Sequence, residues 1–164
     1  MTTFKEIANE VTIDYLVNRI GDYTAIYDQN LFRLLDKFSC GLYDGGLWVV
    51  REYENGAFAY ILPESTIIPE VNSPSMEMVS CSLEAASIAA NFYLLNGLAA
   101  HAIERGNEDL AEKLLNNHRA LGQILSGRMQ DIIDADGLRP ATPEELARPR
   151  QPHPEYKAIR AMID

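Results

Sequence analysis

The sequence predicts a single compact α+β domain, in which a small antiparallel β-meander of about four strands packs against several α-helices. The chain has 164 residues, 47% of them hydrophobic, which suits one domain with its own core. Apolar residues recur at helical spacing before and after a central stretch of β-type pattern. The eight prolines fall in two clusters, so residues 1–62 and 75–139 carry most of the regular structure.

Two amphipathic helices are predicted before residue 40. The first ends at Gly21, a residue type that commonly terminates helices, and the second runs from about Thr24 to Lys37. Both carry apolar residues at three- and four-residue spacing, which we expect to face the core. These residues are Ile13, Leu16, Val17 and Ile20 in the first helix, and Ile26, Leu31, Leu34, Leu35 and Phe38 in the second.

A β-hairpin is the clearest local prediction. Leu47–Tyr53 and Ala57–Leu62 are rich in β-branched and aromatic residues, and they flank Asn55-Gly56. This dipeptide best tolerates the positive φ that a two-residue type I′ turn requires. Both faces of the hairpin are apolar, so it is either covered on both sides or offers one side to a partner. The turn imposes a register that pairs Tyr53 with Phe58, Arg51 with Tyr60, and Val49 with Leu62.

Two short strands are expected to complete the meander. They are Thr66–Ile68 and Met76–Val79, which contain β-branched and other apolar residues. Pro69 follows the first of them and lacks a backbone donor, which is compatible with an edge position.

A long helix, roughly Leu83–Arg105, is predicted after Ser82, whose side chain is suited to cap it. This helix is apolar on nearly every side, and about 20 apolar residues are enough to span a membrane. Four polar residues interrupt the run, and no basic residue flanks its N-terminal end. We therefore expect a buried central helix and no membrane segment. The interrupting residues are Ser87, Asn91, Asn96 and His101.

The C-terminal third is predicted to be a helix, a strap and a short helix. Asn107 is suited to cap a helix, and helical periodicity extends to Ile132 and Ile133. Residues 138–154 form a proline-rich strap, and residues 155–163 form a short C-terminal helix that docks back on the domain.

The chain is acidic, with 14 Lys+Arg against 24 Asp+Glu and a formal net charge of -10. This balance disfavours a sequence-independent grip on DNA phosphates, which needs a basic face. Cys40 and Cys81 are too few for a disulfide framework, and residues 1–10 lack the basic start and apolar stretch of a signal peptide. We expect a soluble cytoplasmic protein whose thiols are reduced.

No residue pattern typical of a catalytic or metal site occurs in the sequence. His101, His118 and His153 show no i, i+4 pairing, and the cysteines have no CxxC spacing. Gly45-Gly46 precedes a predicted strand instead of opening a helix, so it is not a phosphate-binding loop. The sequence therefore predicts a protein that is not an enzyme and that has no catalytic residues, cofactor or metal.

The hairpin region resembles the signature of the ArdB/KlcA antirestriction family. That signature is Tyr-x-Gly-Gly-aromatic-Trp, a short strand, Asn-Gly-Gly-Phe and a proline, followed by an alanine-rich helix. Leu47 replaces the aromatic residue, and Ala57 replaces the second glycine. The resemblance extends from about Val11 to Asp164. The corresponding residues are Tyr43, Asp44, Gly45, Gly46, Trp48, Asn55, Gly56, Phe58 and Pro63, and the helix is Leu83–Ala100.

The resemblance implies a protein of plasmids and other mobile elements that protects incoming DNA from type I restriction-modification systems. Its implied action is inhibition by binding, and its implied partner is the type I complex or a factor that controls it. The motif residues Tyr43, Asp44, Gly45, Gly46, Trp48, Asn55, Gly56 and Phe58 are then the candidate site, serving either the structure or contact with the partner.

The net charge argues against full mimicry of DNA. A domain of this length is about 40 Å across. Duplex DNA of that length presents about 23 charges, more than twice the net charge of -10. Residues 1–82 hold 12 acids and 5 bases, and residues 83–164 hold 12 and 9, so the acids are not segregated.

Two alternative functions remain open from the sequence. Abundant carboxylates are compatible with a metal-dependent hydrolase that acts on nucleic acid. A shared scaffold is compatible with a non-enzymatic interaction module that owes the resemblance to its fold.

Overall fold

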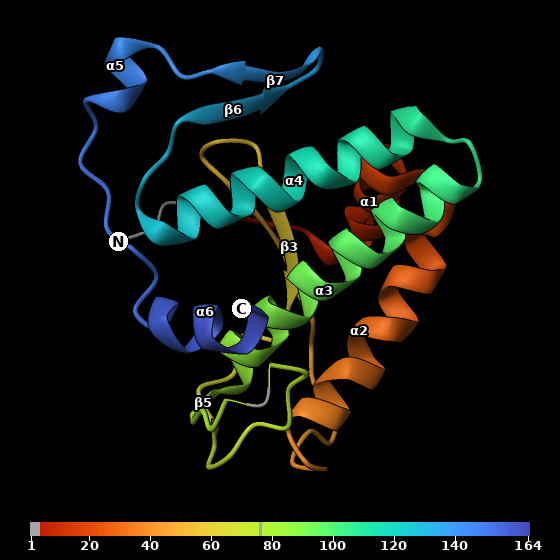
Figure 1. Ribbon diagram of the computed structural model, residues 1–164, viewed down its shortest axis with the longest axis vertical. Coiled ribbons are helices and arrows are strands. Elements are labelled where there is room, and N and C mark those ends of the chain that lie inside the picture. Colours follow the sequence, from red (N-terminus) through yellow and green to blue (C-terminus); the bar gives the residue numbers. More distant parts are fainter. Residues whose placement is uncertain (1–3, 76) are drawn as a thin grey trace.

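The structure, a computed structural model, describes residues 4–75 and 77–164. It is mixed α+β, as the sequence predicts: helices pack with small antiparallel sheets around one hydrophobic core (Figure 1). The long helix α3 (Leu83–Glu104) lies between α2 (Thr24–Phe38) and α4 (Glu108–Ser126), and α6 (Tyr156–Ile163) packs beside its N-terminal half.

Helix α3 is the buried centre of the molecule. It packs against α2, α4, α6 and the sheet, which cover it on several sides. This explains why apolar residues occur on nearly every side of the helix. Ser82 caps it as predicted, because its Oγ accepts a hydrogen bond from the backbone N–H of Ala85. In the part of the chain that the structure describes, no helix is long and apolar enough to cross a membrane.

Helix α1 (Thr12–Ile20) ends at Gly21, as predicted, but it buries a narrower stripe than its pattern suggests. Leu16 and Ile20 are buried, whereas Ile13 and Val17 are 70% and 50% exposed. The prediction that all four face the core is wrong for these two. The helix packs against α2 and α4 along a narrow stripe of buried residues spaced four apart. These residues are Thr12, Leu16 and Ile20. Two short 3₁₀ turns, Asn9–Val11 and Gly21–Tyr23, flank it.

The main sheet has three strands and not the four of the predicted meander. The strands β1 (Phe4–Ile7), β2 (Val49–Tyr53) and β3 (Phe58–Ile61) pair antiparallel in the order β1-β2-β3. Strand β1 was not predicted because it is a short, largely exposed edge strand with charged residues at its centre. The strand predicted at Thr66–Ile68 exists as β4 (Ile67–Ile68).

Strand β4 pairs in a separate ribbon with β5 (Cys81–Ser82) instead of extending the main sheet. The predicted strand Met76–Val79 includes Met76, which lies outside the described residues, and residues 77–79 are not in a strand. Three prolines near this segment remove backbone donors that a longer strand would need.

The β2–β3 hairpin lies where predicted, but its register differs by one residue. Glu52 pairs with Phe58, and Tyr53 donates its N–H to the carbonyl of Ala57. The loop therefore has three residues, of which Gly56 alone has positive φ, at +82°. The predicted two-residue type I′ turn is wrong because Asn55 takes a negative φ and turns its side chain into the core. Both faces of this hairpin are covered.

Residues after α4 form a second hairpin instead of the predicted continuation of the helix. Gly127, at φ +76°, ends α4, and β6 (Asp131–Asp134) then pairs antiparallel with β7 (Gly137–Pro140). Ile132 and Ile133 are thus strand residues, and the prediction of helix there is wrong. A Cβ on Gly127 would stand 2.9 Å from the backbone nitrogen of Pro152, so the strap closes over the helix end.

The proline-rich strap contains short regular elements. It begins within β7 and includes α5 (Pro143–Leu146), a single turn. A capping box between Thr142 and Glu145 begins α5. The C-terminal helix α6 forms as predicted and buries Ile159 and Met162 against α3.

Candidate functional site

The predicted site residues fall into two groups at opposite ends of strand β2. Tyr43–Trp48 precede the strand, and Asn55–Phe58 form the turn that follows it and the start of β3. The structure thus brings the members of each group together, but it does not join the two groups into one cluster.

Trp48 is the centre of the first group. It is 6% exposed, and its indole Nε1 donates to the hydroxyl of Tyr43 at 3.0 Å. Its ring centroid lies 5.0 Å from that of Phe32 on α2 and 5.7 Å from that of Tyr60 on β3. Trp48 and Tyr43 therefore join the loop, the second helix and the sheet in one aromatic cluster.

The two glycines of the first group have backbone conformations that side chains disfavour. Gly45 and Gly46 have φ values of +104° and +143°. A Cβ on Gly46 would also stand 2.7 Å from Cδ1 of Leu62 and 2.8 Å from Oε1 of Glu64. Gly45 is thus explained by its positive φ, and Gly46 by its positive φ together with the close approach of the Leu62 and Glu64 side chains.

Asn55 and Gly56 hold the hairpin turn against two other elements. Asn55 is fully buried, and its Nδ2 donates to the carbonyl of Ala120 on α4 at 2.8 Å. Its backbone carbonyl accepts the N–H of Ile133 on β6 at 2.8 Å. A Cβ on Gly56 would lie 2.3 Å from the carbonyl oxygen of Ile133, closer than real Cβ atoms come. Both motif residues therefore serve packing.

Phe58 is the first of several residues along β3 whose backbone is hydrogen-bonded by helix side chains, which the sequence did not predict. Its backbone N–H and carbonyl are hydrogen-bonded by the buried side-chain amide of Asn117, at 2.8 and 3.0 Å. The amide of Asn91 does the same for Tyr60, at 3.0 and 2.8 Å. Ser87 Oγ accepts the N–H of Leu62 at 3.1 Å. Polar side chains of α3 and α4 thus complete the free edge of β3.

The exposed residues near the first group lie in the loop of residues 40–47, which precedes the buried Trp48. Asp44 is exposed, and Leu42 and Leu47 are 42% and 65% exposed. Cys40 begins this loop with a positive φ of +54°, an uncommon conformation for a residue other than glycine. Of these residues, Asp44 belongs to the predicted site, and Cys40, Leu42 and Leu47 lie beside it in the loop.

A groove of about 840 Å³ lies beside this loop, between residues 39–42 on one side and residues 68–73, 77 and 78 on the other. Met78 on its rim is 82% exposed, and Glu70 and Glu77 add negative charge. We define the contact surface as Leu42, Asp44, Leu47 and the groove next to them. An exposed apolar patch that is rimmed by polar residues can mark a surface that binds another protein.

A buried ionic cluster connects the strap to the core. The carboxylate of Glu84 on α3 forms an ion pair with Arg51, with Nη2 at 2.8 Å. It also accepts a hydrogen bond from His153 Nε2 at 3.2 Å. The hydrogen bond from His153 and the charge of Arg51 lower the pKa of the Glu84 carboxyl. His153 Nδ1 in turn accepts the N–H of Glu155 at 3.0 Å. This arrangement fixes the strap and the start of α6.

The cysteines differ in environment. Cys40 is exposed, whereas Cys81 is buried next to Met162, and burial raises the pKa of the Cys81 thiol to about 12. Both are free thiols. Within residues 4–75 and 77–164, no three His, Cys, Asp or Glu side chains are grouped so that they could hold a metal ion.

One solved structure resembles this chain over nearly its whole length, with a TM-score of 0.69 and 21% sequence identity. The similarity covers 99% of this chain and 95% of the other. That structure comes from work on the KlcA and ArdB proteins, which are described as having a novel fold and antirestriction activity against type I DNA restriction systems in vivo but not in vitro. No protein-family model and no curated protein matches the chain. The chain therefore has the KlcA/ArdB fold, which confirms at the level of the fold the resemblance read from the motif.

Proposed function

We propose that this protein is an antirestriction protein, which protects incoming DNA by inhibiting type I restriction-modification systems in the cytoplasm. The observation that carries the proposal is the likeness of the whole fold to a KlcA/ArdB structure, over 99% of this chain. The motif residues support it, because Gly46, Trp48, Asn55 and Gly56 occupy positions where the fold requires those residue types.

The inhibition that we propose is by binding and not by catalysis. In the motif, Tyr43 and Asn55 use their polar groups in packing: Tyr43 accepts a hydrogen bond from Trp48, and Asn55 donates one to the backbone of α4. The reachable residues, Leu42, Asp44 and Leu47, are suited to contact a protein surface. The expected partner is the type I complex or a factor that controls it.

The activity of the KlcA and ArdB proteins in vivo but not in vitro suggests how to distinguish these partners. A direct inhibitor of the complex reduces DNA cleavage when both are purified. An inhibitor that acts through a controlling factor leaves the purified complex active, and an affinity-tagged copy of this protein then retains that factor from restricting cells. Retention of the complex itself in the tagged sample would identify it as the partner.

The functional test is the plating of unmodified phage on cells that carry a type I system, with and without expression of this protein. We expect expression to raise plating on restricting cells and to leave plating of modified phage unchanged. A cell line without the restriction system controls for effects on phage growth.

The contact surface is tested in the same assay by replacing Leu42 and Leu47 together with Asp. Both side chains are exposed, so the double variant should fold normally yet lose the relief of restriction. Ile13→Asp is the matched control, because Ile13 is an apolar residue 70% exposed on α1. Equal activity of both variants would exclude the loop as the contact surface while leaving the antirestriction proposal in place.

A further inference from the structure

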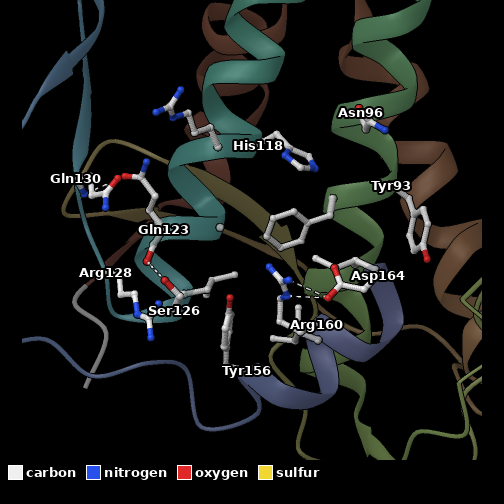
Figure 2. Close-up of a pocket in the computed structure, with 16 residues that line it drawn as sticks. Tyr93, Asn96, His118, Gln123, Ser126, Arg128, Gln130, Tyr156, Arg160 and Asp164 are labelled. Atoms are coloured by element: carbon white, nitrogen blue, oxygen red, sulfur yellow. Dashed lines mark hydrogen bonds and ion pairs between the residues drawn. The ribbon is translucent and has the colours of Figure 1, made fainter.

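A second cavity, of about 500 Å³, opens between α3, α4 and α6, away from the motif (Figure 2). Its volume lies within the range of sites for small molecules. Tyr93 and Asn96 come from α3, His118 and Gln123 from α4, and Tyr156 from α6. Two consecutive helices, α3 and α4, and the later helix α6 thus supply its walls.

The walls of this cavity combine aromatic rings with hydrogen-bonding groups. The ring of Phe92 meets His118 edge-on, with centroids 5.2 Å apart, and Tyr156 lines the cavity from α6. Burial lowers the pKa of His118, so its imidazole is neutral at pH 7 and offers one donor and one acceptor. Within the described residues, the His118 ring nitrogens and the Tyr156 hydroxyl have no hydrogen-bond partner.

The cavity is rich in arginine, although the molecule as a whole is acidic. The chain has 24 acids and 14 Lys+Arg, yet among the described residues three arginines and one acid line this cavity: Arg119, Arg128, Arg160 and Asp164. A local excess of arginine in an acidic protein favours an anionic ligand.

The present partners of the arginines show which chemistry they accept. Arg160 holds the carboxylate of Asp164, with both Nε and Nη2 at 2.9 Å from the same oxygen. Arg119 holds Asp131 at 3.2 Å. The Arg160–Asp164 pair is exposed and therefore exchangeable, whereas the Asp131 side chain is only 16% exposed and also accepts a hydrogen bond from Gln123. In the part of the chain that is described, the Arg128 guanidinium has no partner at all.

We propose that this cavity binds a small aromatic phosphate, with its ring against Phe92 and Tyr156 and its phosphate on Arg128 and Arg160. A phosphate dianion can accept hydrogen bonds from several guanidinium groups at once, which a single carboxylate does less well. This site is separate from the contact surface, and its test does not depend on restriction.

The test is a titration of the full chain with phenyl phosphate, followed by the amide signals in ¹H–¹⁵N NMR spectra. We expect saturable shifts confined to residues of α3, α4 and α6 around the cavity. Inorganic phosphate and benzyl alcohol, which carry only the anion or only the ring, should bind more weakly. Shifts that do not saturate by about 10 mM phenyl phosphate, where even weak sites fill, would overturn the proposal. Inorganic phosphate that binds as tightly as phenyl phosphate would also overturn it.

Arg128→Gln provides the matched variant. Its guanidinium has no partner among the described residues, so the fold should be unaffected. We expect binding of phenyl phosphate to weaken roughly tenfold, the loss of one charge-assisted hydrogen bond. Arg33→Gln, an exposed arginine on α2, should bind as the unaltered protein does. Equal affinity of the two variants would contradict the assigned site.

Discussion

The side-chain amides of Asn91 and Asn117 do for strand β3 what a neighbouring strand does in a larger sheet. Asn91 donates to the carbonyl and accepts from the N–H of Tyr60, and Asn117 does the same for Phe58. Asn91 also donates to the carbonyl of Ser87 on its own helix. Both asparagines are buried on helices, so the strand edge is satisfied without water. This explains why polar residues interrupt the most apolar helix of the chain.

Replacing Asn91 with Leu should destabilise the protein strongly. The change keeps the branching at Cγ and adds some volume, and it leaves the N–H and carbonyl of Tyr60 and the hydroxyl of Tyr27 without a partner. We expect a loss of about 3 kcal/mol or more in the free energy of unfolding, measured in urea. Asn96→Leu, on the exposed side of the same helix, should change it by less than about 0.5 kcal/mol. Similar losses in both would contradict the assigned role.

Alanine at Gly56 and at Gly97 should have opposite effects. At Gly56, φ is +82° and a Cβ would meet the Ile133 carbonyl at 2.3 Å, so we expect a loss of about 2 kcal/mol or more. Gly97 lies in α3 with nothing within 4 Å of its Cβ position, so alanine there should stabilise by about 0.5–1 kcal/mol. Thermal unfolding followed by circular dichroism measures both. An unharmed Gly56→Ala variant would refute the close packing of the turn on β6.

Glu84 should make stability depend on acid pH. Its pKa is lowered in the folded state by His153 and Arg51, from an ordinary value of 4.5. Its carboxylate therefore stabilises the fold above that value, and the contribution is lost as pH falls through the lower, folded-state pKa. We expect Glu84→Gln to be less stable than the unaltered protein at pH 7, with a difference that shrinks between about pH 5 and pH 3. A difference that stays constant over this range would contradict the ionic role of Glu84.

At the scale of elements, the sequence predicts the helices better than the sheets. The predicted ranges of α2, α3 and α6 agree with the structure to within a residue or two, because caps such as Ser82 and apolar periodicity act locally. The hairpin register was wrong because it depends on where the Asn55 side chain finds a partner, on α4 far along the chain. Likewise, β6 looks helical by spacing alone and becomes a strand through pairing with β7.

The docking of α6 should control the reactivity of Cys81. The thiol lies under Met162, which is fully buried, and its raised pKa of about 12 keeps it protonated. In a disulfide-exchange reagent at pH 8, we expect the exposed Cys40 to react at once and Cys81 to react only on unfolding. Met162→Asp should release α6 and make Cys81 react in native buffer.

Lys157→Asp is the control for this experiment, because Lys157 is exposed on the same helix. It should leave Cys81 protected. Rapid labelling of both thiols in the unaltered protein would show that α6 does not cover Cys81.

At the scale of the whole molecule, the candidate site divides into residues that build the fold and residues that a partner can reach. The motif could be recognised from the sequence, but its division could not, because exposure depends on which elements cover each side chain. Trp48 is covered by α2 and by β3, whereas Leu47 beside it is exposed. The cavity between α3, α4 and α6 also escaped prediction, since it forms where α6, from the end of the chain, docks beside α3 and α4.

The central claim is that this chain relieves type I restriction by binding. The most direct measurement is the plating efficiency of unmodified phage on restricting cells, relative to isogenic cells without the restriction system. With the protein expressed and folded, we predict that this ratio rises towards that of modified phage. A ratio as low as that of cells carrying the empty vector, with folded protein present in the cells, would contradict the claim.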